Sequence, residues 1–571
     1  MIGGQAGLPF PNLPVSLPDF SDLATARRSA CSSCARFGKT IRGASESGHA
    51  KQIGLGIEMK KLLFALGTVT AMTGAASAAD LAAMPYVKAP APIAAPSWTG
   101  FYVFGGGGGG LWNADSNEVA VGAGFGGFPA GTTLTRDQRL GGSGWFGTVG
   151  AGYDWQSSNW VVGIFGDGQF GDIRGSLSDA YFALEGREKL RTSYAAGARL
   201  GYLVAPNVLS YVNGGYSGSD WSGATLSTLY AVPVPSVTTA TSSFRRDGWF
   251  VGGGVENNLN IFGINAPGWF MRTEYRSAYY NRIALPETRT DNGLLTGTAV
   301  TFKPWVQTIS TSLVYRFNSG GPIVAATDLA ARPYVKAPAA VVGPSWTGFY
   351  GFGGAGGGLW NADSNIVATS TGGLGPAGTV LARDQRLGGS GWFGTVGAGY
   401  DWQFSSNWVA GIFGDGQFGD IRGSLSETIV FAEGREKLRT SYAAGARLGY
   451  LVAPNVLSYV NAGYSGSQWS GTTLSAFDDG TPYHTTPSFH RDGWFVGGGV
   501  ENSLNLFGIA APAWFMKTEY RSAFYDRISL PTTDVFGRPG GSALTFKPWV
   551  QTISTSLVYR FNSDGAVVAK Y

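Results

Sequence analysis

Residues 190–202 have the sequence LRTSYAAGARLGY, in which chemical character changes at every second position. One face carries Leu190, Thr192, Tyr194, Ala196, Ala198, Leu200 and Tyr202, and the other carries Arg191, Ser193, Ala195, Gly197, Arg199 and Gly201. A period of two predicts a β-strand. Residues 269–280 and 302–317 alternate in the same way, with tryptophan and tyrosine near the segment ends. Segments of about ten such residues match tilted strands that cross a bilayer.

The opening stretch lies within a long internal repeat. Residues 185–213 recur unchanged as 433–461, residues 136–156 as 383–403, and residues 301–319 as 545–563. An offset of 244 to 248 residues indicates the duplication of a whole domain, since solenoid and propeller repeats are much shorter. Each copy divides into eight alternating segments joined by connections that are short and long in turn. Short periplasmic turns and longer external loops produce this rhythm in outer-membrane barrels.

Composition supports a membrane barrel. Of the 571 residues only 14% are charged, 13% are aromatic and 89 are glycine. Beyond a short run near Leu62, no apolar stretch approaches the length of a spanning helix. The net charge of +4, without a lysine or arginine cluster, gives no reason to expect a nucleic-acid partner. The only cysteines, Cys31 and Cys34, lack a second pair, so a zinc or redox site is not expected.

An export signal begins at Met59. Two lysines, an apolar run over residues 62–71 and Ala76-Ser77-Ala78 have the order of a secretory signal peptide with its cleavage site. We therefore expect Met59 to be the true start. The predicted divisions are a doubtful extension (1–58), a signal peptide (59–78), a Pro/Ala-rich lead (79–97), barrel repeat 1 (98–317), a periplasmic linker (318–345), barrel repeat 2 (346–561) and a tail (562–571).

These motifs together resemble the outer-membrane immunogenic proteins, or porin-family small barrels, of alphaproteobacteria. The resemblance is carried by ASAAD (76–80), the opening WTGFY (98–102), GAGYDWQ (150–156), RLGY (199–202) and the closing SLVYRF (312–317 and 556–561). It implies an outer-membrane location, outer-membrane lipid around the barrel, and recognition of the closing aromatics Phe317 and Phe561 by periplasmic chaperones and the barrel-assembly machinery. Two departures from the family are the duplication and the ten residues after Phe561.

The predicted fold is all-β: two tandem eight-stranded, antiparallel, up-and-down transmembrane barrels. One sixteen-stranded barrel with a wide pore is the alternative. Each copy has its own opening and closing strand, which are natural partners, and the Ala/Pro-rich linker is a long tether among short turns. Both features favour two barrels.

Charged residues at inward positions form the candidate site. Facing lipid, an arginine or lysine at the bilayer midplane would cost about 2–4 kcal/mol, so we place them in the lumen. Both signs of charge occur, which predicts salt bridges that plug the narrow barrels, with a channel selectivity ring as the alternative. The predicted lumen residues are Asp167, Arg191, Arg199, Glu256, Arg272, Glu274 and Arg276 in repeat 1, and Asp415, Arg439, Arg447, Glu501, Lys517, Glu519 and Arg521 in repeat 2.

Catalytic, cofactor and metal sites are not expected. Glycine strings at 105–110 and 353–358 resemble phosphate-binding loops, but no helix follows them. His484 and His490 occur in one copy only, and His490 corresponds to Arg245 in the other, so loop residues in solvent are the favoured interpretation over metal or haem ligands.

Three functions remain open on the sequence alone. The first is a structural or surface-interaction barrel whose external loops meet an unknown extracellular partner. The second is a porin for passive diffusion of small solutes. The third is a soluble, secreted double β-domain. Beyond these three, the family resemblance implies surface haem binding as a further alternative.

Overall fold

The computed structural model describes residues 97–231, 238–259, 266–317, 345–369, 374–504, 511 and 513–561. All of them fall in one compact unit, Pro92–Tyr571. The predicted extension and signal peptide, nearly all of the lead and the linker, and the tail lie outside the described residues. Within the described part of the chain, no helix is long and apolar enough to cross a membrane.

Repeat 1 forms eight long strands. They are β1 (Gly100–Ser116), β3 (Gln138–Ser157), β4 (Trp160–Asp179), β5 (Leu184–Ala205), β6 (Val208–Trp221), β9 (Phe244–Asn258), β10 (Trp269–Tyr280) and β12 (Leu295–Arg316). Four short strands accompany them: β2 (Glu118–Ala120), β7 (Thr225–Thr228), β8 (Thr239–Ala240) and β11 (Ile283–Arg289). Each of the eight predicted segments overlaps one long strand.

Repeat 2 has the same eight long strands. They are β13 (Gly348–Ala368), β14 (Val380–Gln403), β15 (Trp408–Glu427), β16 (Ala432–Ala453), β17 (Val456–Trp469), β20 (Phe489–Ser503), β21 (Trp514–Tyr525) and β23 (Pro539–Arg560). The short elements are the 3-10 helix η3 (Thr428–Val430) and the strands β18 (Thr472–Ala476), β19 (Pro482–Thr486) and β22 (Ile528–Asp534).

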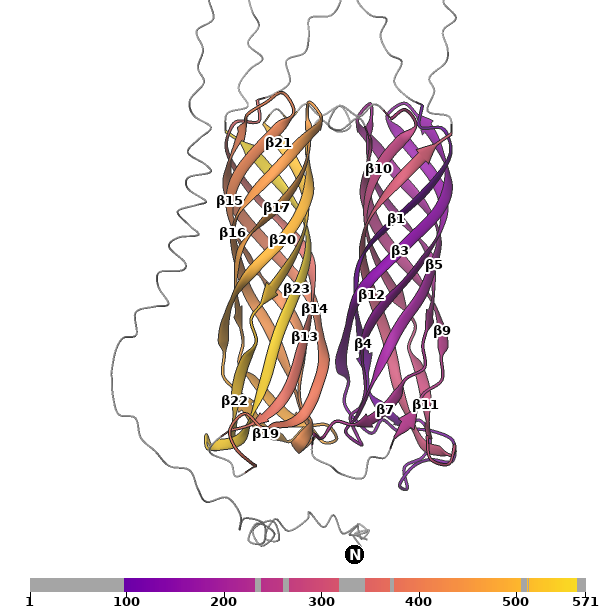
Figure 1. Ribbon diagram of the computed structural model, residues 1–571, viewed down its shortest axis with the longest axis vertical. Helices are drawn as coiled ribbons and strands as arrows, with labels where there is room; N and C mark the ends of the chain where they lie inside the picture. Colours follow the sequence, from indigo (N-terminus) through magenta and orange to yellow (C-terminus); the bar gives the residue numbers. More distant parts are fainter. Residues whose placement is uncertain are drawn as a thin grey trace, which may run out of the picture. The chain divides into compact units, whose positions relative to one another are not determined.

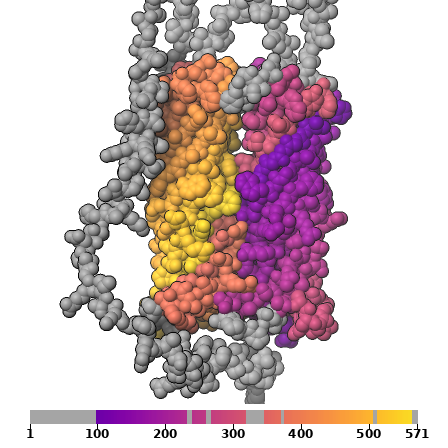
Figure 2. Space-filling model, in the orientation of Figure 1, coloured from indigo at the N-terminus to yellow at the C-terminus, as the bar shows by residue number. Residues whose placement is uncertain are grey.

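Each repeat closes on itself. Strand β1 pairs with β12 from Tyr102↔Arg316 to Asp115↔Lys303, and β13 pairs with β23 from Tyr350↔Arg560 onward. A sixteen-stranded barrel would instead pair β12 with β13, a pairing that the registers of the described strands do not contain. The two closed sheets are visible as separate sets of tilted strands (Figure 1), and β1 runs obliquely across the surface of the first (Figure 2).

An apolar belt between two aromatic girdles surrounds each barrel. On β3, Trp145 and Trp155 are 80% and 50% exposed, and Val149 lies exposed between them. Ten residues at about 3.3 Å each, tilted by about 40°, span roughly 25 Å, which is the height of the lipid-facing band of outer-membrane barrels. Facing lipid, rather than water, explains why large apolar side chains lie outside.

The two ends of each barrel differ. One end carries the tight turns, such as the turn between β3 and β4, and the other carries β7 and β11 or β19 and β22 (Figure 1). In outer-membrane barrels the end with short turns faces the periplasm. The long strands continue well beyond the outer girdle: residues 178–179 of β4 still pair with residues 184–185 of β5.

The barrels contact each other through reciprocal hydrogen bonds. Asn113 Nδ2 donates to the carbonyl oxygen of Gly389 (2.6 Å), and Asn361 Nδ2 donates to that of Gly142 (2.7 Å). Gly141 permits this close approach, since a Cβ there would lie 2.3 Å from Asn361 Oδ1. Because the two repeats use corresponding residues, the contact is self-complementary in the manner of a twofold dimer interface.

Candidate functional site in the barrel lumen

A cluster of four charged residues fills the lumen of repeat 1 near the short-turn end. Arg199 and Arg316 both pair with Asp154 and with Glu256; Arg199 Nη1 lies 3.0 Å from Glu256 Oε2, and Arg316 Nη2 lies 2.8 Å from Asp154 Oδ2. All four residues are at most 3% exposed. Two positive and two negative charges balance, so the hydrogen-bonded cluster leaves no net charge in this layer.

Aromatic rings complete this layer. The guanidinium of Arg316 lies 4.3 Å from the ring centroid of Trp98, and that of Arg199 lies 4.4 Å from that of Tyr102. A cation over an aromatic face is attracted by the ring quadrupole, most strongly where water is excluded. The rings therefore close the space that the ion pairs leave.

A second charged layer lies further along the lumen. Arg276 donates to Asp167 at 2.9 and 2.6 Å and to Glu274 at 2.9 Å, while the hydroxyl of Tyr211 donates to Glu274 at 2.7 Å. Arg272 lies 3.6 Å from the ring centroid of Phe104. This layer also contains two arginines and two carboxylates.

An aromatic layer follows toward the outer end. Trp112 contacts Trp221 and Phe302 edge to face, and Phe244 stacks on Trp221. Trp112, Trp221 and Phe302 are at most 1% exposed. Charged and aromatic layers together occupy successive levels of the lumen.

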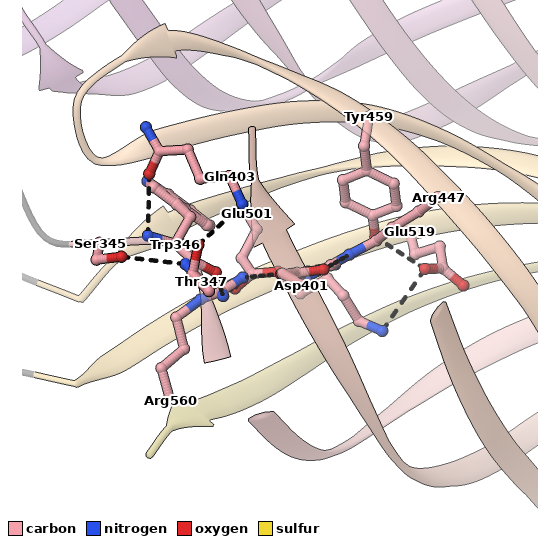
Figure 3. Close-up of polar contacts among 11 residues, drawn as sticks. Ser345, Trp346, Thr347, Asp401, Gln403, Arg447, Tyr459, Glu501, Glu519 and Arg560 are labelled. Carbon is pink, nitrogen blue, oxygen red and sulfur yellow. Dashed lines mark hydrogen bonds and ion pairs between the residues drawn. The ribbon is translucent and has the colours of Figure 1, made fainter. Parts of the chain in front are cut away.

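Repeat 2 reproduces the charged layers with one substitution. Arg447 and Arg560 pair with Asp401 and Glu501, and Tyr459 donates to Glu519, as Figure 3 shows. Arg521 pairs with Asp415 at 2.5 Å and with Glu519 at 2.8 Å. Lys517 takes the place of Arg272, with its ammonium 3.3 Å from the ring centroid of Phe352 and 3.5 Å from Glu519.

Comparisons with known proteins point to outer-membrane barrels. Residues 64–317 match the family described as outer membrane protein beta-barrel domain. The chain is 29% identical over 176 residues to the 31 kDa outer-membrane immunogenic proteins of Brucella melitensis and Brucella suis, which covers 30% of this chain and 67% of each relative. These matches support an outer-membrane β-barrel protein. The resemblance inferred from its motifs is confirmed, as are the all-β fold class and the outer-membrane location.

Solved structures that resemble this outer-membrane barrel protein do so only distantly. A FadL homologue of Pseudomonas aeruginosa is 12% identical, covers 81% of this chain and 90% of its own, and has a TM-score of 0.25. The attachment invasion locus protein Ail of Yersinia pestis is 12% identical, covers 36% of this chain and 99% of its own, and has a TM-score of 0.17.

The structure places twelve of the fourteen predicted lumen residues inside the barrels of this outer-membrane protein. They are buried and make up most of the charged layers: Asp167, Arg199, Glu256, Arg272, Glu274, Arg276, Asp415, Arg447, Glu501, Lys517, Glu519 and Arg521. The alternation of each strand was therefore sufficient to place most of these side chains.

Arg191 and Arg439 do not belong to the lumen, and the prediction is corrected for both. Each is exposed. The register of β5 with β6 slips between Leu190 and Thr192, and the equivalent slip occurs in β16. A β-bulge inserts one extra residue and so inverts the alternation beyond it. Leu190 and Arg199 consequently both point inward, although strict alternation puts them on opposite faces.

The prediction missed four members of the two charged layers: Asp154 and Arg316, with their counterparts Asp401 and Arg560. A signal was present for each. Asp154 lies between two outward aromatics, Tyr153 and Trp155, and Arg316 lies between Tyr315 and Phe317. Alternation across these triplets points the charge inward.

The remaining named residues lie outside the lumen network. Phe317 and Phe561 are 57% and 61% exposed at the ends of the closing strands, where their backbone N–H groups bond to Phe101 and Phe349. His490 is exposed and contacts Asp492 on β20. His484 on β19 is mostly buried, with Nδ1 2.6 Å from Glu427 Oε2, which differs from the predicted solvated loop position.

Proposed function

We propose that this outer-membrane barrel protein has a structural and surface-interaction role, exercised through its external loops, and that its lumens do not conduct. The observation that carries the proposal is the balanced, fully hydrogen-bonded cluster of Arg199, Arg316, Asp154 and Glu256, repeated in the second barrel. An eight-stranded barrel is only wide enough inside for its own side chains. The charged and aromatic layers use that space.

The energetics favour a plug over a pore lining. Separating a buried, hydrogen-bonded ion pair leaves charges without partners, which costs about 3–5 kcal/mol. Opening a path past Arg199 and Arg276 would disrupt several such contacts at once. Passive diffusion of solutes is therefore the weaker alternative for this protein, and we also expect neither catalysis nor a bound cofactor.

The outer ends offer apolar side chains to a partner. Leu294 and Leu295 are 64% and 65% exposed at the tip between β11 and β12, and Val535 and Phe536 are 52% and 79% exposed at the tip between β22 and β23. The two tips differ in sequence but share this apolar character. We propose that they contact an extracellular partner, with lipid around the apolar belt and the assembly machinery acting on the closing strands.

Single-channel conductance tests the proposal. The mature, full chain is folded in detergent and reconstituted into planar bilayers, with its heat-dependent gel mobility as the check on folding. We expect a folded protein without stable conductance steps.

A large trimeric or monomeric porin in the same bilayers provides the positive control. Large, steady steps from the folded chain would overturn the plugged lumen and restore the porin alternative.

A further inference from the structure

Three acidic side chains converge at the outer end of repeat 1, beyond the aromatic layer. Glu118 lies on β2, Asp179 at the end of β4 and Glu287 on β11. Each offers a carboxylate oxygen, and these oxygens all lie within 4.8 Å of one another. The three residues are 1%, 0% and 0% exposed.

Hydrogen bonds account for only part of this cluster. Glu287 accepts from the hydroxyls of Thr239 and Thr298, both at 3.0 Å, and Asp179 Oδ1 accepts from the backbone N–H groups of Tyr181 and Phe182. Both carboxylate oxygens of Glu118, and Oδ2 of Asp179, are buried without a hydrogen-bond partner.

Positive charge is missing as well. Among the described residues, no ion pair joins these three carboxylates to an arginine, lysine or histidine. Burial, followed by the neighbouring carboxylates, raises the pKa of Glu118 and of Asp179 well above the usual range. Buried charges are ordinarily paired or coordinate a metal ion. The three carboxylates thus lack the positive partner that a bound cation would provide.

The corresponding position in the second barrel does not contain three carboxylates. By register, Ile366 replaces Glu118 and Thr532 replaces Glu287, while Glu427 replaces Asp179. Glu427 accepts from Ser542 Oγ at 2.5 Å and contacts His484 Nδ1 at 2.6 Å. One carboxylate with a histidine and a hydroxyl thus stands where repeat 1 has three carboxylates.

We propose that Glu118, Asp179 and Glu287 bind one Ca²⁺ ion at the outer end of the first barrel. All the donors are oxygen atoms, as hard cations prefer, and Ca²⁺–oxygen distances of about 2.3–2.6 Å allow opposed ligands to lie about 4.6–5.2 Å apart. Mg²⁺ releases its waters reluctantly, so a fully buried site suits it less. The ion would join β2, β4 and β11 and stiffen the loops they carry.

Calcium binding to the full chain tests this site. The protein is refolded in detergent from a preparation free of lipopolysaccharide, because lipid phosphates bind Ca²⁺ themselves, and is stripped with a chelator. Equilibrium dialysis against radioactive Ca²⁺ at pH 7.5 should show one ion bound per chain, and Ca²⁺ should raise the thermal unfolding temperature.

The matched variant gives repeat 1 the residues of repeat 2: Glu118→Ile with Glu287→Thr. It should lose the bound ion and the thermal shift. Should it fail to fold, Glu118→Gln, which keeps the side-chain shape, should weaken binding at least tenfold. Glu427→Gln in repeat 2 should leave the stoichiometry at one. No bound Ca²⁺ at millimolar concentration, or unchanged binding in the folded Glu118 variants, would overturn the proposal and indicate carboxyl groups that hold protons instead.

Discussion

The two barrels of this chain are nearly the same near their short turns and differ at their outer ends. The charged layers correspond residue for residue except for Arg272 and Lys517, whereas the outer end of repeat 1 has an acidic cluster where repeat 2 has Glu427 with His484. Residues in the narrow lumen must match partners on several strands at once, while loop residues have few obligatory neighbours. The charged layers of the lumen therefore belong to the structure that both barrels share, whereas the outer ends distinguish one barrel from the other.

The largest effect should come from breaking the four-residue charge cluster near the short-turn end of either barrel. Asp154→Ala removes one of the two carboxylates that accept from Arg199 and Arg316, and leaves Glu256 as the remaining carboxylate of the cluster. We expect the free energy of unfolding to fall by about 3–5 kcal/mol, since a buried charge loses its partner. Denaturant titration in detergent, followed by tryptophan fluorescence, measures it.

Asp401→Ala should have the same effect on the second barrel, because Arg447 and Arg560 meet Asp401 in the same geometry. Asp291→Ala, which removes an exposed pair with Arg289, is the control and should leave the unfolding midpoint unchanged. A loss below about 1 kcal/mol at either buried aspartate would contradict a lumen held by these pairs.

A smaller difference between the repeats concerns Glu188 and Glu436. Burial raises the pKa of Glu188 to about 8 and that of Glu436 to about 7. The second repeat has Thr472, whose hydroxyl donates to Glu436 Oε2 at 2.9 Å, where the first has Ala224 and leaves Glu188 Oε2 without a partner. The hydroxyl of Thr472 lowers the pKa of Glu436, since a donor favours the charged carboxylate, and Glu188 lacks this donor.

The sign of the pH dependence follows from the raised pKa. Between about pH 4.5 and pH 8, the carboxyl group of Glu188 is protonated in the folded protein and ionised in the unfolded chain, where its pKa is near 4.5. Its contribution to stability is therefore complete below about pH 4.5 and is lost as the pH rises through about 8. Ala224→Thr should raise the free energy of unfolding by about 1 kcal/mol at pH 8 and by less at pH 5.

Thr472→Ala should produce the opposite change in the second barrel. The free energy of unfolding of both variants, measured at pH 5 and at pH 8, tests this prediction. An equal gain at pH 5 and pH 8 would show that the hydroxyl does not act on the charged form.

The smallest expected effect leaves each barrel intact and loosens their contact. Gly141→Leu with Gly388→Leu places side chains where Asn361 and Asn113 now approach the backbone. Spin labels at positions 294 and 536, in place of Leu294 and Phe536, should then give a broader distance distribution in double electron–electron resonance. The free energy of unfolding should not change. Gly147→Leu is the control, because a Cβ there meets only a carbonyl oxygen at 3.8 Å. An unbroadened distribution would show that the glycines do not govern the contact.

Much of the fold could be predicted because it rests on local periodicity. Trp145 and Trp155 mark the girdles, and the alternation of β10 placed Arg272, Glu274 and Arg276 inward without reference to any other strand. The site was predicted less completely, since Arg191 has the same residue type as Arg199 but lies at a bulge. A bulge depends on the partner strand, which the alternation of one strand does not reveal.

The sequence by itself determined that this chain makes membrane-spanning β-strands, that a barrel-sized unit is duplicated and that inward charges of both signs occur. Each of these follows from spacing along the chain, which a one-dimensional pattern preserves. Only the tertiary structure decided that Arg316 meets Asp154 across 162 residues, and that Glu118, Asp179 and Glu287 converge at the outer end of repeat 1. Such contacts depend on register and closure, which bring together residues that no local pattern relates.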